Sequence, residues 1–472
     1  MRRKLQLAVI LLLLFLYIVL YYIPYKRTME KTASASLGRV GDGARISSST
    51  PILSSLSSPI IVVVTKSIQN RSDNKPIYNQ TVKQTLDLMT LQREFDSFKI
   101  PDINCEGIIK GDPEALADSD QKRANVVPDD YTLIKHTANC DYFRKIYGYD
   151  EIINTDEEIN FPIAFNILLY KEVAQVEILL RAIYRPQNYY CLHVDGFSPD
   201  HVHKAAKSLA DCFDNVFIVS KTENVVYKSF QRLQADLNCM ADHLAKPDWK
   251  YLINLPSQEL PIKTNLEIVR ILTAINDRNS IECITELKHM LSGRFLLKYK
   301  NKYYADGVHY SVVLTDDKNP PLPHGMKPVK GSAYGVFTRR FVNYIFNNQV
   351  AKDLLEWCRG VLSPDEYYWS TLNHNPHLQV PGSYEGSCKG VLSTYVNWQV
   401  TSNYTKCKGR VLRYICIFGP GDLQTLVSRK ELFANKFILA YSYKAIQCLS
   451  EWLRNQTFSP QRIDEQFYES TF

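Results

Sequence analysis

The stretch Phe161-Pro-Ile-Ala-Phe-Asn-Ile-Leu-Leu-Tyr170 decides the fold, because it is an almost continuous apolar run with the length of a buried strand. Residues 173–184 follow with apolar side chains at helical spacing, and Asn188-Tyr-Tyr-Cys-Leu-His-Val-Asp195 is a second strand-like run. A strand, a helix and a strand in this order predict a βαβ unit whose two strands lie parallel in one sheet.

The same alternation continues along the chain, after a predicted helical lead-in over residues 86–160. It predicts helices over about 199–212, 228–244 and 265–275 and strands over 215–220 and 249–255. We therefore predict an α/β fold in which helices flank a mostly parallel, Rossmann-like sheet. Such sheets bind ligands beyond the carboxyl ends of their strands, where Asp195 and the loop 256–261 are expected.

The N-terminus is typical of a membrane anchor. Residues 5–23 are apolar apart from Gln6 and the tyrosines near their end, and three basic residues precede them. A helix of this length can cross a bilayer, and no small-residue cleavage site follows it. The predicted organisation is a cytoplasmic tail over 1–4, a transmembrane signal anchor over 5–23, a Ser/Thr-rich stem over 24–85 and a lumenal catalytic domain over 86–472.

Glycosylation acceptors and cysteines favour a lumenal location for most of the chain. Four Asn-x-Ser/Thr sequons lie downstream of the predicted anchor, at Asn70, Asn79, Asn403 and Asn455. All eleven cysteines are also downstream. In a lumenal protein most of them would be paired, and the odd number requires a free thiol or an intermolecular link.

Composition and motifs exclude several classes of protein. The net charge of +7 on 472 residues includes no dense basic block, so nucleic acid is not an expected partner. The sequence has no Gly-x-Gly-x-x-Gly, Gly-Lys-Ser/Thr or Cys-x-x-Cys motif, which argues against dinucleotide, P-loop and zinc sites. The Asp-x-Asp at Asp118-Ser-Asp120 precedes the first core strand and is predicted to form a solvated turn.

Two adjacent carboxylates, Asp365 and Glu366, stand behind a proline and before an aromatic cluster. The local pattern favours a helix start, with Ser363 as the N-cap and Pro364 at the first helical position. A carboxylate is also the usual group for taking a proton from a sugar hydroxyl. The rest of the chain favours this second interpretation for Glu366.

Several short motifs occur in order along the chain: His193-Val194-Asp195, Cys212-Phe-Asp-Asn-Val-Phe217, Ala235-Asp-Leu-Asn-Cys239, Trp249-Lys-Tyr-Leu-Ile-Asn-Leu255, Leu260-Pro-Ile-Lys-Thr-Asn265, Gly331-Ser-Ala-Tyr334, Ser363-Pro-Asp-Glu366, Cys416-Ile-Phe-Gly-Pro-Gly-Asp422 and Leu432-Phe-Ala-Asn-Lys-Phe437. Across roughly residues 105–455 they resemble the core 2/I-branching β-1,6-N-acetylglucosaminyltransferase family, glycosyltransferase family 14. The resemblance implies a variant of the GT-A nucleotide-sugar fold, a type II Golgi membrane protein, and inverting transfer from a UDP-sugar.

The resemblance also implies the residues of the reaction. Glu366 matches the catalytic base, while Arg413 and Lys436 match two cations that stabilise the leaving UDP in place of a metal. No metal or other cofactor is therefore expected. Asp195 is the implied contact on the uridine side, although an aspartate at a strand end is often only a helix cap.

Glu282 and Trp398 align with residues that contact the acceptor sugar, the first by hydrogen bonds and the second by stacking. A Trp buried in the core is an equally good interpretation of Trp398. The chain departs from the family at Glu259, where relatives tend to carry aspartate, and at Val400, where an acceptor-contacting tyrosine is usual.

By the same resemblance four disulfides are implied: Cys105–Cys448, Cys140–Cys212, Cys191–Cys239 and Cys407–Cys416. Cys283, Cys358 and Cys388 have no family partner. Two of these three can pair with each other and one can link a dimer, and the sequence does not distinguish the combinations.

The expected function is transfer of a β-1,6-linked sugar to an O-glycan such as Galβ1-3GalNAc, with UDP-N-acetylglucosamine as the default donor. UDP-glucose and UDP-xylose are alternative donors. An alternative of another class is an inactive lumenal lectin or scaffold. The joint presence of Glu366, Arg413 and Lys436 argues against this alternative, because a binding module does not need cations at a leaving group.

Overall fold

A computed structural model of the chain describes residues 61–65, 81–85, 87–284, 291–304, 310–383, 391–399 and 405–471. The predicted tail, anchor and most of the stem, with Asn70 and Asn79, lie outside these residues and stay predictions. Within the described ranges, no helix is both long and apolar enough to cross a membrane. In the predicted stem, β1 (Ile61–Thr65) and β2 (Thr81–Thr85) pair as antiparallel strands.

The central sheet has six strands in the order β5-β4-β3-β6-β11-β8. Their bounds are β3 Ile163–Leu169, β4 Tyr189–Val194, β5 Val216–Ile218, β6 Tyr251–Pro256, β8 Ser280–Ile281 and β11 Gly335–Thr338. The pairs β3–β4, β3–β6 and β4–β5 are parallel, and β11 is antiparallel to both of its neighbours. The predicted mostly parallel α/β sheet and its four predicted strands are confirmed.

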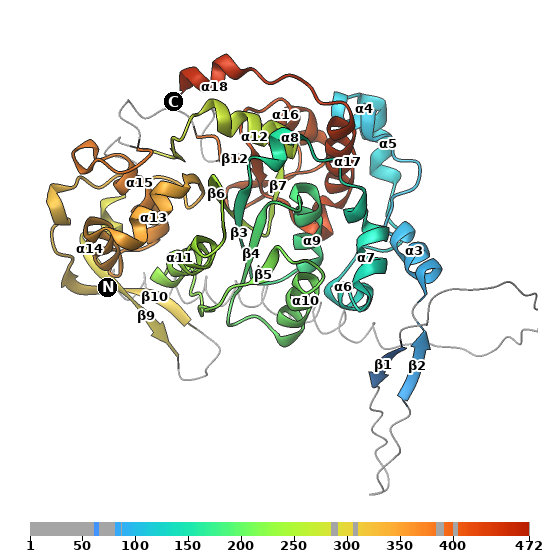
Figure 1. Cartoon of the computed structure of the whole chain (residues 1–472), viewed down its shortest axis with the longest axis horizontal. Helices are drawn as coiled ribbons and strands as arrows, with labels where there is room; N and C mark the ends of the chain where they lie inside the picture. Colours follow the sequence, from blue (N-terminus) through green and yellow to red (C-terminus); the bar gives the residue numbers. More distant parts are fainter. Residues whose placement is uncertain are drawn as a thin grey trace, which may run out of the picture. The chain divides into compact units, whose positions relative to one another are not determined.

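The helices between these strands also agree with the prediction. They are α9 Val173–Ile183, α10 Asp200–Ala210, α11 Phe230–Leu244 and α12 Asn265–Ala274. From β3 to β5 the chain moves toward one edge of the sheet, and it then returns across β4 and β3 to β6. Right-handed crossovers therefore place α9 and α10 on one face and α11 on the other, as Figure 1 shows.

Side chains of the strands alternate between two hydrophobic cores. On β3, Ile163, Phe165 and Ile167 belong to the core beneath α9 and α10, while Ala164 belongs to the core beneath α11. On β11, Val336 faces the first core and Phe337 the second. The nearly continuous apolar runs of the sequence follow from this burial on both faces.

The predicted helical lead-in is confirmed. It consists of α3 Leu88–Ser97, α4 Cys105–Lys110, α5 Pro113–Gln121, α6 Asp130–His136, α7 Cys140–Tyr147 and α8 Asp156–Ile159. The prediction of a turn at Asp118-Ser-Asp120 is wrong, because both aspartates lie on α5. Asp112 caps this helix and Pro113 occupies its first turn, so helix formation starts just upstream of the two exposed carboxylates.

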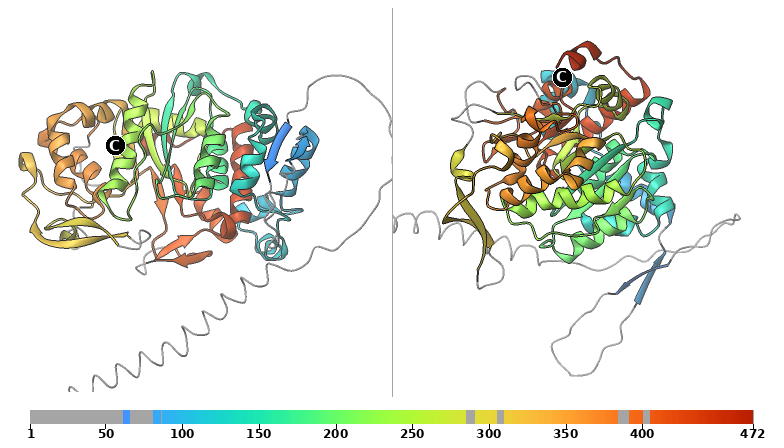
Figure 2. Two further views of the ribbon diagram at one scale, coloured as in Figure 1. Left: turned by 90° about the horizontal axis from the view of Figure 1, so that it is seen from below. Right: turned by 60° about the vertical axis from the view of Figure 1, so that its left-hand side comes forward.

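The remaining elements lie outside the central sheet and its crossover helices. They are β7 Glu259–Pro261, β9 Leu297–Tyr303, β10 Tyr310–Lys318, α13 Arg339–Asn347, α14 Gln349–Cys358, α15 Tyr368–Asn373, β12 Thr394–Val396, β13 Arg410–Leu412, β14 Ile415–Ile417, α16 Leu423–Val427, β15 Phe433–Asn435, α17 Leu439–Phe458 and α18 Glu465–Thr471. A small second sheet has the order β12-β15-β7. Figure 2 shows the ribbon of β9 and β10 alongside the helices α13 to α15.

The four implied disulfides are confirmed: Cys105–Cys448, Cys140–Cys212, Cys191–Cys239 and Cys407–Cys416. Cys283 is also disulfide-bonded, and Cys388 lies outside the described residues. Cys358 has a free thiol that is completely buried on α14. A dimer link through Cys358 would therefore require this helix to move.

Candidate active site

The segment from Ser363 to Glu366 is a 3₁₀ turn ahead of α15. Ser363 lies in the left-handed region with φ of 54°, and its side chain makes no capping hydrogen bond, so the predicted N-cap is wrong. Its N–H instead donates to the carbonyl oxygen of Lys228 at 2.8 Å. The bend buries Asp365 and leaves the Glu366 side chain 27% exposed.

The Glu366 carboxylate is held at one oxygen by two cations. Its Oε2 accepts from Arg294 Nη1 at 2.7 Å and is 3.0 Å from Lys330 Nζ. The backbone carbonyl of Glu366 accepts the Gly331 N–H at 2.7 Å. Among the described residues, no group donates to Oε1 of Glu366, so this oxygen is the one available to take a proton.

Glu282, the predicted acceptor contact, lies close to Glu366. Its backbone carbonyl accepts the Ser370 hydroxyl at 2.8 Å, which ties the end of β8 to α15. Burial raises the pKa of the Glu282 carboxyl, nearby Lys330 opposes the rise and Glu366 adds to it. The structure thus brings two residues together that are 84 positions apart in the sequence.

Gly331 allows this convergence. A Cβ atom at Gly331 would lie 2.2 Å from the Glu282 carbonyl oxygen and 2.0 Å from Ser370 Oγ. Any other residue would push these backbones apart. The glycine of the Gly331-Ser-Ala-Tyr334 motif is therefore required by close packing at the site.

Arg413 lies in the turn of the hairpin formed by β13 and β14. Arg413 and Tyr414 have φ of 49° and 66°, which is the backbone of a two-residue type I′ turn. Both side chains are exposed. The tight turn therefore fixes the backbone of Arg413 and leaves its guanidinium exposed to solvent.

Lys436 directly follows β15, which ends at Asn435. The next residue, Phe437, donates its N–H to the Gln258 carbonyl at 2.9 Å, which places this segment at the carboxyl end of β6. Burial lowers the pKa of Lys436, and repulsion from Arg413 lowers it further. The two cations predicted to bind UDP are therefore near enough to repel each other when no anion lies between them.

Trp398 lies beside the same hairpin. It forms an antiparallel bridge with Ile415, and it is 42% exposed. The interpretation as a buried core Trp is therefore wrong, and part of the side chain is accessible to a ligand. Val400 and the sequon residue Asn403 lie outside the described residues, whereas Asn455 is exposed on α17.

Asp195 directly follows β4 and joins two loops. Its Oδ1 accepts the N–H groups of Phe197 at 3.1 Å and Val225 at 3.0 Å. The helix-cap alternative is wrong, because Pro199 is the N-cap of α10 and no hydrogen bond joins that first turn to Asp195. Asp195 therefore shapes the carboxyl ends of β4 and β5, where a nucleotide is expected.

Glu259 is completely buried on β7. It accepts from Thr394 Oγ1 at 3.2 Å and from Asn435 Nδ2 at 3.4 Å. Burial raises the pKa of the Glu259 carboxyl well above its usual range. A neutral, buried carboxylic acid is a poor ligand for a divalent cation.

A buried polar network that the sequence did not predict lies beside Asp365, the residue that precedes Glu366. Asp236 on α11 accepts from Arg232 at 2.5 Å and from Asn254 Nδ2 at 3.1 Å. Arg232 in turn lies 4.0 Å from the Asp365 carboxylate. One residue in the sequence could have predicted this network. Asn254 is an amide within an otherwise apolar strand, and a buried polar group needs hydrogen-bond partners.

We expect Asp365→Asn to alter the pH dependence of folding. Burial raises the pKa of Asp365 to about 6, opposed by Arg232 and increased by Glu366. Because this value exceeds that of the unfolded chain, ionisation of Asp365 disfavours the native state as the pH rises. The free energy of unfolding of the variant, relative to the original protein, should therefore increase from about pH 4 to pH 7 in urea titrations.

Asp353→Asn on α14 is the matched control for this prediction. Hydrogen bonds from Gln349 and His324 lower the pKa of the exposed Asp353 carboxyl, so its charge stabilises the native state. Loss of this charge in the variant should slightly lower the free energy of unfolding at pH values above the pKa of aspartate in the unfolded chain. Relative to the original protein, the free energy of unfolding of Asp353→Asn should therefore decrease as the pH rises. The same trend in both variants would contradict the assignment for Asp365.

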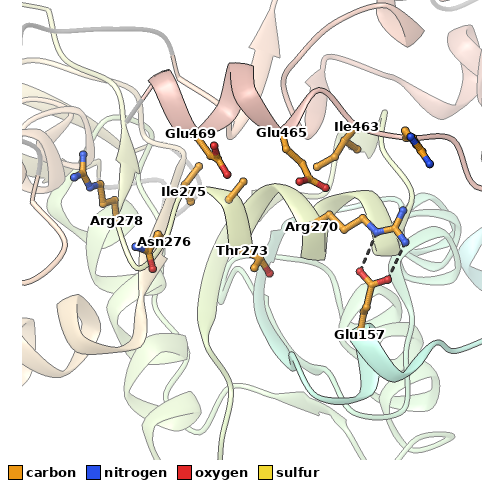
Figure 3. A pocket seen from close by; sticks show the side chains of 11 residues that line it. Glu157, Arg270, Thr273, Ile275, Asn276, Arg278, Ile463, Glu465 and Glu469 are labelled. Carbon is orange, nitrogen blue, oxygen red and sulfur yellow. Dashed lines mark hydrogen bonds and ion pairs between the residues drawn. The ribbon is translucent and has the colours of Figure 1, made fainter.

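A wide cavity of about 1010 Å³ lies between the end of α12 and the segment leading into α18 (Figure 3). Arg270 in its wall is already held by Glu157 through hydrogen bonds of 2.9 and 2.8 Å. Because α12 runs back from the carboxyl ends of the strands, its last turn lies at their amino ends. The cavity is therefore at the opposite end of the sheet from Glu366 and Lys436.

One further cluster among the described residues has the residue types of a metal site, namely Cys407, Cys416 and Asp422. The two cysteines form a disulfide, and Asp422 accepts the N–H groups of Lys408 at 2.8 Å and Gly419 at 2.9 Å. This cluster therefore stabilises the loop between β14 and α16.

Comparison with known proteins agrees with this arrangement. The family model described as Core-2/I-Branching enzyme matches residues 163–427, more than half of the chain. The human β-1,3-galactosyl-O-glycosyl-glycoprotein β-1,6-N-acetylglucosaminyltransferase is 40% identical over 377 residues, which cover 75% of this chain and 86% of that protein. The human enzyme 3 of the same name is 35% identical over 382 residues, covering 76% and 85%. The Danio rerio enzyme 4 is 38% identical over 364 residues, covering 75% and 84%. This chain therefore belongs to the core-2/I-branching enzyme family and is a glycosyltransferase of that kind.

Proposed function

We propose that the chain transfers a sugar from a UDP-sugar to an O-glycan of the Galβ1-3GalNAc type, forming a β-1,6 linkage with inversion. N-acetylglucosamine is the proposed sugar, and a variant GT-A fold is the proposed scaffold. The observation that carries this proposal is the Glu366 carboxylate beside Glu282, which is held at Oε2 and which, among the described residues, accepts no hydrogen bond at Oε1. The names of the relatives support the same substrate class.

In the proposed reaction Glu366 Oε1 takes the proton of the acceptor hydroxyl as its oxygen attacks the anomeric carbon of the donor. The bond between that carbon and the diphosphate oxygen breaks, and its electron pair leaves with UDP. Arg413 and Lys436 stabilise the growing negative charge. Trp398 offers its exposed indole face to the acceptor, and Asp195 shapes the uridine end.

We further propose that the transfer needs no divalent metal. The two cations near each other provide the charge that a metal would supply. Glu259, at the end of the sheet where an acidic metal ligand would be expected, is buried, and its burial raises the pKa of the carboxyl well above its usual range. The chemistry of the side chains present therefore favours a cationic protein site for the diphosphate.

The proposed location is the Golgi membrane, with the anchor at residues 5–23 and the catalytic domain, residues 86–472, in the lumen. Four disulfides in the described residues support an oxidising compartment. Glycosylation at the four sequons is part of the same proposal. A disulfide-linked dimer is not proposed, since the free thiol of Cys358 is buried.

A donor screen of the secreted lumenal domain tests the proposal. It offers UDP-N-acetylglucosamine, UDP-glucose and UDP-xylose with Galβ1-3GalNAc as the acceptor, each with and without EDTA. We expect transfer of N-acetylglucosamine that survives EDTA. A preference for glucose or xylose would correct the donor, and loss of transfer in EDTA would contradict the metal-free mechanism. A folded protein that binds the acceptor but transfers nothing would support the inactive lectin.

A further inference from the structure

Lys330 lies where three segments of the chain meet. Its backbone carbonyl accepts the Ile284 N–H at 2.7 Å, next to Glu282. The following residue, Gly331, donates its N–H to the Glu366 carbonyl at 2.7 Å. Lys330 therefore belongs to the short stretch of backbone that joins the Glu282 segment to the Glu366 turn.

The Lys330 side chain points into this junction. Its side chain is only 14% exposed, and its ammonium lies 3.0 Å from Glu366 Oε2. A further hydrogen bond of 3.2 Å joins it to the Gly331 carbonyl, which limits its rotamers. A partly buried ion pair with fixed geometry orients its partner better than a solvent-exposed pair does.

The surroundings of Glu366 explain why a cation is needed there. Several charged and titratable groups contact the Glu366 carboxylate or interact with its charge. They are Arg294, Lys330, Glu282, Asp365, Tyr334 and Tyr367. Two of them, Glu282 and Asp365, are carboxyl groups, so that three carboxyl groups, with Glu366, lie near one another. Neighbouring carboxylates disfavour the ionisation of each other, and a nearby cation offsets this effect.

We propose that Lys330 is a positioning residue of the transfer reaction. Its ammonium fixes Glu366 Oε2, so that Oε1 is directed to the acceptor hydroxyl, and it offsets the repulsion between the Glu366 and Glu282 carboxylates. This role rests on the proposed function of Glu366 as the base. Lys330 itself exchanges no proton: the acceptor proton moves to Oε1, and the ammonium stays paired with the carboxyl group.

Lys330→Met tests this role, because it keeps the length of the side chain and removes its charge. We expect kcat to fall roughly 10- to 100-fold, the loss typical of a misplaced reacting group. The KM for the UDP-sugar should stay within about twofold, since the ammonium of Lys330 contacts Glu366 and Gly331 and neither of the predicted diphosphate cations. The acidic limb of the rate profile should move to higher pH, because an ionised carboxylate loses one of its two cations.

Lys330→Arg and Lys327→Met are the matched variants. Arginine keeps the charge and should restore most of kcat and the original pH profile. Lys327 is exposed three positions upstream, so its loss of charge should change neither quantity. If a melting curve shows that Lys330→Met is not folded, the pH profile of the rate is measured for Lys330→Gln and tests the same prediction.

The outcomes separate this inference from the proposed function. Equal kcat and equal pH profiles for Lys330→Met and Lys327→Met would overturn the positioning role. A rise in the acceptor KM alone would also overturn it, and would make Lys330 a binding contact. Full activity of Glu366→Gln would instead remove the base itself, and with it the proposed function.

Discussion

Glu366→Gln is expected to lower the rate of transfer by roughly 10²- to 10⁴-fold, the usual contribution of a general base. The amide cannot take the acceptor proton at Oε1, although it keeps the size of the carboxylate. UDP binding should be nearly unchanged, because Glu366 interacts with Arg294 and Lys330 and not with the predicted diphosphate cations. Initial rates with a radiolabelled donor and calorimetric titration with UDP measure the two quantities.

Glu356→Gln is the control for this variant. Glu356 is an exposed carboxylate on α14 whose ion-pair partner is Arg359 at 2.5 Å. It should leave transfer unaltered. If the Glu366 variant kept the original rate, another group would have to accept the proton. If it lost both rate and UDP affinity, its effect would be on the structure of the site.

Arg413→Ala and Lys436→Ala are each expected to lower kcat by roughly 10²- to 10³-fold, as removal of an electrostatic stabiliser of the transition state does. They should also weaken UDP binding, because the diphosphate is charged in the ground state and gains charge during bond breaking. The two effects should appear together in kcat/KM for the donor and in the Kd of UDP.

Arg410→Ala provides the control in the same hairpin, since it removes an equal charge from the other end of β13. It should change the Kd of UDP only slightly, through long-range attraction that added salt screens. Unchanged UDP affinity in both Arg413→Ala and Lys436→Ala would contradict the metal-free model of leaving-group stabilisation. A recovery of either variant by added Mn²⁺ would show that a metal can replace the lost charge.

Local sequence patterns were sufficient for the central architecture. The apolar runs of β3, β4, β5 and β6 and the helical spacing between them predicted the parallel sheet, because burial on both faces imposes continuous hydrophobicity. The resemblance to a known family correctly implied four disulfides. It also selected Glu366 and Glu282, which the structure brings together, and Arg413 and Lys436, which are mutually close.

Local patterns failed where the chain bends or where distant segments meet. Ser363 has the sequence signature of an N-cap but adopts a left-handed backbone, because its N–H is bound by Lys228 from another part of the chain. Trp398 could not be assigned to the core or the surface, since its exposure depends on the neighbouring hairpin.

The sequence by itself predicted the strands and helices from β3 to α12 and, through resemblance, the candidate residues of the proposed reaction. Only the tertiary structure decided the charge environment of those residues. Arg294 and Lys330 meet Glu366 from 72 and 36 positions away, and burial of β7 raises the pKa of Glu259. The physical reason is range: hydrophobic periodicity is a local property of the chain, whereas desolvation and ion pairing depend on every group that folding brings near.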